Sequence, residues 1–139
     1  MRDWRSFQEM ARGYFELEAG TNLVREVSLR LDDGQTHRFD LGSQDESVLI
    51  ECKSYTFTVG GKEPAAKINH AKTDAQLLKG SRATRKIIVF DDDVHPKKGS
   101  LAELFARRNS SWLADVEVWR HWQGKFERIH PAVRAPHAK

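Results

Sequence analysis

Three residues in the first half of the chain have the types and the spacing needed to hydrolyse a phosphodiester bond. Asp40 is followed, after ten intervening residues, by Glu51-Cys52-Lys53, the only E-x-K triplet in the sequence. Two carboxylates supply the hard oxygen ligands that suit Mg²⁺ or Mn²⁺, and the backbone carbonyl of Cys52 could add another. Such an ion stabilises charge on phosphate oxygens and activates a bound water, which Lys53 could orient or help to deprotonate.

The first acid can meet the triplet only if two strands bring them together. Residues 23–31 alternate in hydropathy and predict a strand, Asp33-Gly34 has hairpin-turn chemistry, and residues 37–41 predict the returning strand. Asp40 ends that second strand. An antiparallel pairing with the next strand would place its carboxylate beside the triplet.

The run from residue 47 to 59 is predicted to be the longest strand of the chain. Because successive side chains of a strand point to opposite faces, Glu51 and Lys53 share one face. Cys52 falls on the opposite face together with Ile50 and is assigned to the core.

The other elements follow from apolar spacing and turn residues. They are helices over residues 3–18, 65–79 and 100–108, a short buried strand over residues 87–90, and a terminal hairpin of residues 116–122 and 125–129. The order α-β-β-β-α-β-α followed by a β-hairpin predicts an α/β (α+β) fold with a central mixed sheet flanked by helices. We expect one domain over residues 1–130 and a flexible basic tail over residues 131–139.

With this order of elements, the chain resembles the PD-(D/E)xK nuclease superfamily, which has the restriction-endonuclease-like fold. The resemblance covers roughly residues 5–95 and is carried by Asp40 as the first acid, Glu51-Cys52-Lys53 as the E-x-K motif, and the interval between them. It implies divalent-metal-dependent cleavage of DNA by a single nuclease-like domain, with Asp40 and Glu51 as metal ligands and Lys53 as the catalytic lysine. The superfamily's proline before the first acid is absent, because Phe39 stands there.

Two further site residues are implied by the resemblance alone. Many members place a glutamate of the first helix near the metal; Glu9, Glu16 and Glu18 compete for that role, and Glu9 is favoured by its distance from the first strand. Members can also carry a glutamine on the helix after the E-x-K motif. Gln76 stands in that region as a phosphate or water contact.

The composition fits a DNA-binding protein without requiring one. The chain has 23 basic and 20 acidic residues, a net charge of +3, and a single cysteine, which excludes an intrachain disulfide. One group of basic residues could contact DNA phosphates or equally form a solvated surface: Lys79, Arg82, Arg85 and Lys86. No signal peptide or membrane span is apparent, so a cytoplasmic protein is expected.

Several alternatives remain open at this level. An E-x-K triplet also arises by chance as a solvent-facing ion pair, and a catalytically inactive nucleic-acid-binding module could keep the fold and basic surface without turnover. Trp112, Trp119 and Trp122 could stack on bases, pack in the core, or form a homodimer through the Trp-rich terminal hairpin. The acidic run of residues 91–93 is interpreted as a solvated turn.

Overall fold

The computed structural model describes residues 3–132, so most of the predicted basic tail lies outside the described residues. The elements are α1 (Trp4–Ala19), β1 (Leu23–Arg30), β2 (Thr36–Ser43), β3 (Val48–Lys53), α2 (Ala65–Lys79), β4 (Arg85–Asp91), β5 (Val94–His95), β6 (Gly99–Ser100), α3 (Leu101–Leu113), β7 (Val116–Trp122) and β8 (Lys125–His130). The predicted order of elements is confirmed, with a short ribbon of β5 and β6 added before α3.

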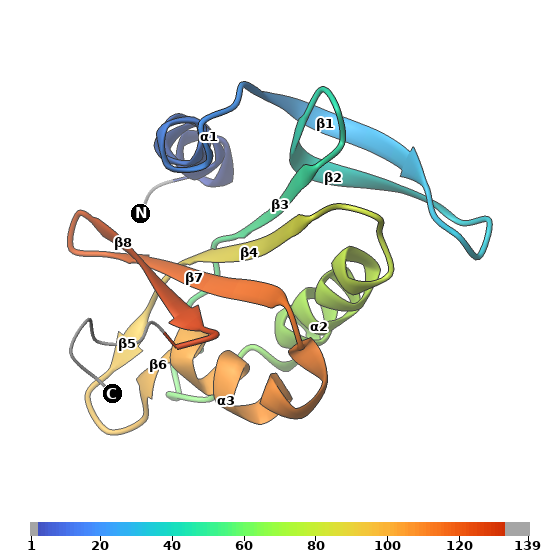
Figure 1. Cartoon of the computed structure of the whole chain (residues 1–139). Helices are drawn as coiled ribbons and strands as arrows, with labels where there is room; N and C mark the ends of the chain where they lie inside the picture. Colours follow the sequence, from blue (N-terminus) through green and yellow to red (C-terminus); the bar gives the residue numbers. More distant parts are fainter. Residues whose placement is uncertain (1–2, 133–139) are drawn as a thin grey trace, which may run out of the picture.

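Six strands form one mixed sheet in the order β1-β2-β3-β4-β7-β8. The strands β1, β2 and β3 are antiparallel neighbours, β3, β4 and β7 run parallel to one another, and β8 returns antiparallel to β7. The terminal hairpin is therefore an integral part of the central sheet. The predicted mixed sheet flanked by helices is confirmed (Figure 1).

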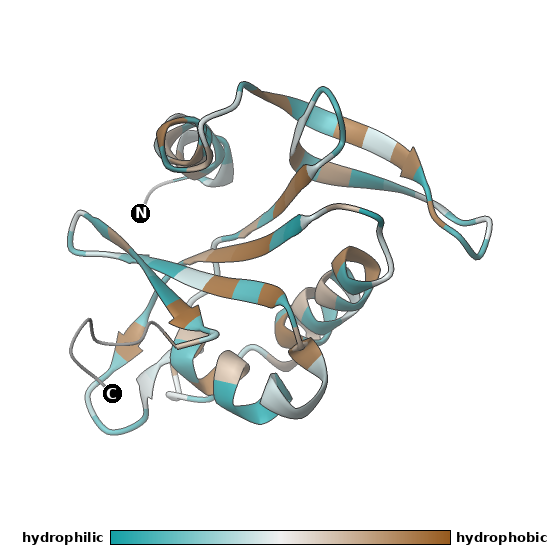
Figure 2. Ribbon diagram, viewed as in Figure 1, coloured by the Kyte–Doolittle hydropathy of each residue, from teal (hydrophilic) through white to brown (hydrophobic). Residues whose placement is uncertain are grey.

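Helices cover both faces of this sheet (Figure 1). On one face α1 buries Phe15 in a cluster that includes Ile50 of β3, and on the other α2 and α3 contribute Leu78 and Phe105 to a cluster that includes Leu49. Figure 2 shows the apolar strands β3 and β4 lying between the two helical layers. The neighbours Leu49 and Ile50 thus face opposite sides, as the predicted alternation of β3 requires.

The limits of α1 follow from its flanking residues. Oδ1 of Asp3 accepts a hydrogen bond from the amide of Ser6 at 2.8 Å, which satisfies one of the free amides at the helix N-terminus. Gly20 ends the helix in the left-handed conformation, with φ of 67°, which costs glycine little because it lacks a Cβ. These two caps set where α1 begins and ends.

The third strand is shorter than predicted, because β3 ends at Lys53 rather than near residue 59. Within residues 3–132, the β-forming sequence after Lys53 pairs with no strand, and β4, the parallel partner of β3, pairs only as far as Phe90 opposite Lys53. The chain leaves the sheet there, and the amide of Phe57 donates to a carboxylate oxygen of Asp93 at 2.8 Å. Lys53 is therefore the last residue of a strand, at the rim of the sheet.

The acidic run after β4 is not a solvated turn, and that interpretation was wrong. The side chain of Asp92 is fully buried; its Oδ1 accepts the amide of Ala102 at 3.0 Å, and its Oδ2 lies 3.3 Å from Nη1 of Arg120. A carboxylate is favoured there because the first turn of α3 presents unpaired amide groups. Asp92 and Asp93 thus fasten α3 and the loop after β3.

The tryptophans of the C-terminal part are mainly structural. Trp119 is buried, and its ring meets that of Phe15 edge to face at 5.1 Å. Nε1 of Trp112 donates to Oδ1 of Asn109 at 3.0 Å within α3. A homodimer through this hairpin stays a prediction. Within residues 3–132, no helix is both long and apolar enough to cross a membrane.

Candidate active site

Asp40 and Glu51 lie where β2 and β3 separate. The two strands pair antiparallel through Gly42 with Leu49 and Leu41 with Ile50, so the next position places Asp40 opposite Glu51. At this position, hydrogen bonds from backbone amides to carboxylate side chains replace the backbone pairing of the two strands. The amide of Asp40 donates to Oε1 of Glu51 at 3.2 Å. The inferred pairing of the second and third strands is confirmed.

Asp40 is also bound to the strand that carries the triplet. The amide of Cys52 donates to Oδ2 of Asp40 at 2.8 Å, whereas Oδ1 of Asp40 accepts no hydrogen bond from the described residues. Burial raises the pKa of Asp40, and the bond from Cys52 partly offsets this. The Cys52 side chain packs on the α1 face, as predicted, and the ligand role of its carbonyl stays a prediction.

Glu51 is almost completely buried, with 3% of its surface exposed. Burial raises its pKa to about 7, an effect that the neighbouring His37 opposes and the charge of Asp40 increases. Each carboxylate oxygen has its own neighbour. Oε1 lies 3.5 Å from Nε2 of His37, and Oε2 lies 3.7 Å from Nζ of Lys53. A buried acid so surrounded is typical of a functional site.

Lys53 points toward two carboxylates. Its ammonium group forms an ion pair with Oδ2 of Asp74, from α2, and lies close to Glu51. Burial alone would lower the pKa of Lys53, but the bond to Asp74 and the charge of Glu51 outweigh it and raise the pKa. Lys53 is therefore a cation that can orient a water or stabilise a phosphate. It is not a base in this arrangement.

His37 and Asp74 are site residues that the sequence reasoning missed. Nε2 of His37 and one carboxylate oxygen each of Glu51 and Asp74 all lie within 4.8 Å of one another. Nε2 of His37 is buried and has no hydrogen-bond partner among the described residues, although it faces both carboxylates. Asp40 does not belong to this group. The site therefore has two adjoining parts that share Glu51.

A cleft of about 400 Å³ opens beside Asp40 and Lys53. It is bordered by an aromatic residue of α1, two residues that follow β3, and a lysine of α2: Trp4, Ser54, Tyr55 and Lys67. Trp4 is half exposed. Nζ of Lys67 lies 5.9 Å from the ring centroid of Tyr55. An exposed aromatic ring and an ammonium group thus border the opening above the acids.

None of the three glutamates of α1 contacts the site within the described residues. Glu9 pairs with Arg12 and Arg25, Glu16 accepts the amide of Leu23 at 2.9 Å, and Glu18 pairs with Arg85; the favoured candidate Glu9 therefore lies in a surface ion-pair group. Besides Trp4 at the cleft, Gln8 of α1 reaches the site. It is buried, and its Nε2 lies 3.5 Å from the carbonyl oxygen of Asp40.

The other predicted contacts lie away from the acids. Gln76 is exposed and borders a small pocket together with Leu77 and Gly80, with neither Asp40 nor Lys53. The basic group lies toward the opposite end of β4, because Arg85 pairs with Val48 whereas Lys53 pairs with Phe90. At that end of the strand, its side chains form hydrogen bonds and ion pairs with other residues of the protein.

Within the basic group, Nζ of Lys86 is buried and donates to the carbonyl of Lys79, and Arg85 pairs with Glu18 and Glu117. Arg82 is largely exposed and pairs with Asp32. DNA contact by this group stays a prediction.

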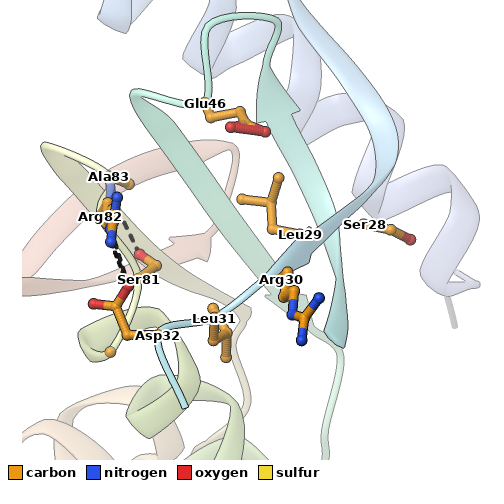
Figure 3. Close-up of a pocket in the computed structure, with 10 residues that line it drawn as sticks. Ser28, Leu29, Arg30, Leu31, Asp32, Glu46, Ser81, Arg82 and Ala83 are labelled. Carbon is orange, nitrogen blue, oxygen red and sulfur yellow. Dashed lines mark hydrogen bonds and ion pairs between the residues drawn. The ribbon is translucent and has the colours of Figure 1, made fainter. Parts of the chain in front are cut away.

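The pocket drawn in Figure 3 is separate from these residues. It has a volume of about 330 Å³ and lies between β1 and the chain after α2. Arg82 and Asp32 form an ion pair on its wall. Asp40, Glu51 and Lys53 are not among its lining residues, whereas Asp40 and Lys53 line the cleft of about 400 Å³.

Comparisons with known proteins leave the family of this chain open. No family model and no curated protein sequence matches it. Among solved structures it is similar to SfsA of Pyrococcus furiosus, solved in complex with Ca²⁺, with 20% sequence identity and a TM-score of 0.42. The match covers 89% of this chain and 62% of that one. This chain therefore spans less than two thirds of the SfsA chain.

Proposed function

We propose that the chain is a divalent-metal-dependent nuclease of the PD-(D/E)xK type, which hydrolyses DNA phosphodiester bonds with an activated water. One observation carries the proposal: Asp40 and Glu51 face each other where β2 and β3 separate, with Lys53 on the same strand face as Glu51. The proposed catalytic unit is one domain over residues 1–130.

The donor atoms of the site fit Mg²⁺ or Mn²⁺. Oδ1 of Asp40 accepts no hydrogen bond from the described residues, and the carboxylate of Glu51 lies next to the amide of Asp40. Carboxylate oxygens are the preferred ligands of these ions, and the Cys52 carbonyl would complete the protein's contribution. The ion, when bound, supplies charge stabilisation on the phosphate and a lower pKa for the attacking water.

Lys53 acts in this proposal as a fixed cation. Asp74 and Glu51 hold its ammonium group at the end of β3, where it can orient the attacking water and neutralise charge that develops on the phosphate. Because the pKa of Lys53 is raised, proton removal falls to another group or to solvent. The substitution Lys53→Arg would keep the positive charge but replace the compact ammonium group with a planar guanidinium group.

The cleft supports a nucleotide as the substrate. Its volume of about 400 Å³ can admit one nucleotide next to Asp40. Trp4 offers a half-exposed ring on which a base can stack, and Lys67 offers a charge for a backbone phosphate. This arrangement favours a DNA strand that can expose an unpaired base near the scissile bond.

The test is a nicking assay on supercoiled plasmid and on branched DNA, with Mg²⁺, Mn²⁺ or EDTA. We expect wild-type protein to cut only with metal, and Asp40→Asn and Lys53→Ala to lose at least 100-fold in rate. Lys125→Ala, at an exposed lysine that begins β8, is the matched control and should cut like wild type. Metal-independent DNA binding without cleavage by any of the proteins would replace the proposal with an inactive binding module.

A further inference from the structure

We propose that His37, Glu51 and Asp74 form a second cation site that selects a transition-metal ion of the Mn²⁺ class over Mg²⁺. The three side chains come from β2, β3 and α2, so the fold brings them together from distant parts of the chain. This site shares Glu51 with the proposed nuclease centre. It requires neither DNA nor catalysis.

The spacing of the three donor atoms suits one ion. Nε2 of His37 lies 3.5 Å from Oε1 of Glu51 and 3.9 Å from Oδ1 of Asp74. Ligands bound to one ion at about 2.1 Å are roughly 3.0–3.5 Å apart in octahedral or tetrahedral geometry. The two distances from Nε2 approach this range, and all three donor atoms lie within 4.8 Å of one another, so rotations of the two carboxylates can bring them to one ion.

The histidine nitrogen lacks any other partner. Nε2 is buried, and 3.5 Å and 3.9 Å are too long for good hydrogen bonds to the two carboxylates. The ring is held edge to face against Phe39 at 4.6 Å, which keeps Nε2 aimed at the acids. A buried nitrogen without a partner destabilises the metal-free protein. Coordination of a cation would satisfy it.

The charges leave room for a divalent ion. Lys53 lies against the outer oxygens, Oε2 of Glu51 and Oδ2 of Asp74, so that Oε1 and Oδ1 remain on the side of His37. With neutral His37, the two carboxylates and one ammonium group sum to one negative charge. A divalent cation therefore binds an anionic pocket, although Lys53 lies next to it.

The imidazole decides the class of metal. Mg²⁺ prefers oxygen ligands and retains its waters, whereas Mn²⁺, Co²⁺ and Zn²⁺ accept imidazole nitrogen readily. Asp40 is outside this group of donors. The second site should therefore take Mn²⁺ in preference to Mg²⁺ and keep it when Asp40 is neutralised.

The test uses pulsed electron paramagnetic resonance of Mn²⁺ added to the tag-free full chain without DNA. We expect ¹⁴N modulation from one imidazole, which persists in Asp40→Asn and disappears in His37→Gln, with a loss of at least tenfold in Mn²⁺ affinity. His70→Gln, an exposed histidine of α2, is the matched control and should keep the signal. Excess Mg²⁺ should not displace the nitrogen-coupled Mn²⁺.

Other outcomes decide against the second site. Bound Mn²⁺ without nitrogen coupling in wild type, or coupling that survives in His37→Gln, would overturn it. If circular dichroism shows that His37→Gln is unfolded, Asp74→Asn decides instead: it must weaken Mn²⁺ binding at least fivefold, and unchanged binding would overturn the site. DNA cleavage is measured separately, so an inactive protein with nitrogen-coupled Mn²⁺ would refute only the nuclease.

Discussion

The backbone amide of Cys52 donates a 2.8 Å hydrogen bond to Oδ2 of Asp40. This bond ties the acid of β2 to the strand that carries Glu51 and Lys53. It does so beyond Leu41 and Ile50, the last paired residues of the two strands at this end. The carboxylate is thereby fixed in orientation before any ligand arrives. Preorganisation of this kind is what a metal site requires of its ligands.

Asp40→Asn should separate catalysis from stability. An asparagine oxygen can still accept the bond from Cys52, so we expect the free energy of unfolding to change by about 1 kcal/mol or less. The loss of the charge should reduce Mg²⁺-dependent cleavage at least 100-fold. Chemical denaturation and single-turnover cleavage check both parts. Asp115→Asn, at an exposed turn, is the control, and equal cleavage by both variants would contradict the role of Asp40.

Lys53→Met should destabilise the metal-free protein. It removes the ammonium group between Glu51 and Asp74 and leaves the buried carboxylate of Glu51 and the partly buried one of Asp74 uncompensated, at a cost of about 3 kcal/mol at pH 8. Mn²⁺ should restore part of this loss, because the ion replaces the missing positive charge. Urea denaturation with EDTA and with Mn²⁺ measures the difference.

The control for this change is Lys86→Met. Lys86 is also buried, but its ammonium group donates to the backbone carbonyl of Lys79 and not to a carboxylate. The destabilisation caused by Lys86→Met should therefore be the same with EDTA and with Mn²⁺. Equal metal rescue of both variants would show that Lys53 has no special relation to the two acids.

The stability of the metal-free protein should fall as the pH rises from about 4.5 to 7. The pKa of Glu51 is raised from 4.5 to about 7 by burial, so over this interval the folded state binds a proton that the unfolded state has lost. The stabilisation is complete below pH 4.5 and is lost as the pH passes 7, a change of about 3 kcal/mol. His37, whose pKa is raised by Glu51, contributes in the same direction.

Glu51→Gln provides the comparison. It cannot titrate, so the difference in unfolding free energy between the two proteins should change with pH by about the same 3 kcal/mol. Denaturation curves in EDTA at several pH values measure this difference. A difference that stays constant from pH 4.5 to 7.5 would mean that Glu51 ionises normally.

Trp4→Ala should weaken DNA binding with little effect on the chemical step. Its ring borders the cleft beside Asp40 and is half exposed, and stacking of one base is worth about 1–3 kcal/mol. We expect KM for single-stranded or branched DNA to rise at least fivefold while kcat stays within a factor of two. Trp122→Ala, in β7 outside the cleft, should leave KM unchanged. The same KM for both variants would remove Trp4 from the substrate site.

Local patterns were sufficient to predict most of the elements and the meeting of the two acids. Asp40 lies in a strand that returns from a turn, although β2 runs on to Ser43 rather than ending near Asp40 as predicted, and alternation places Glu51 and Lys53 on one face. The pairing of β2 with β3 therefore follows from short-range features. The end of β3 could not be predicted in this way. It depends on where β4 stops, which is a tertiary property.

The missed residues carry a signal that is visible only in retrospect. Asp74 lies three residues after Ala71 and four before Leu78, so it is a carboxylate on the buried face of α2. Gln8 similarly lies among the buried residues of α1. A polar residue on an apolar face indicates a buried partner but does not identify it. The partner is known only once the helix is docked on the sheet.

Anomalous diffraction from crystals soaked with Mn²⁺ tests directly whether Asp40 and Glu51 hold a metal ion. We expect a peak about 2.2 Å from one carboxylate oxygen of Asp40 and one of Glu51, distinct from any peak at His37. In crystals of Asp40→Asn this peak should be absent. A map in which no peak contacts Asp40, from wild-type crystals soaked at a saturating Mn²⁺ concentration, would contradict the proposed metal site.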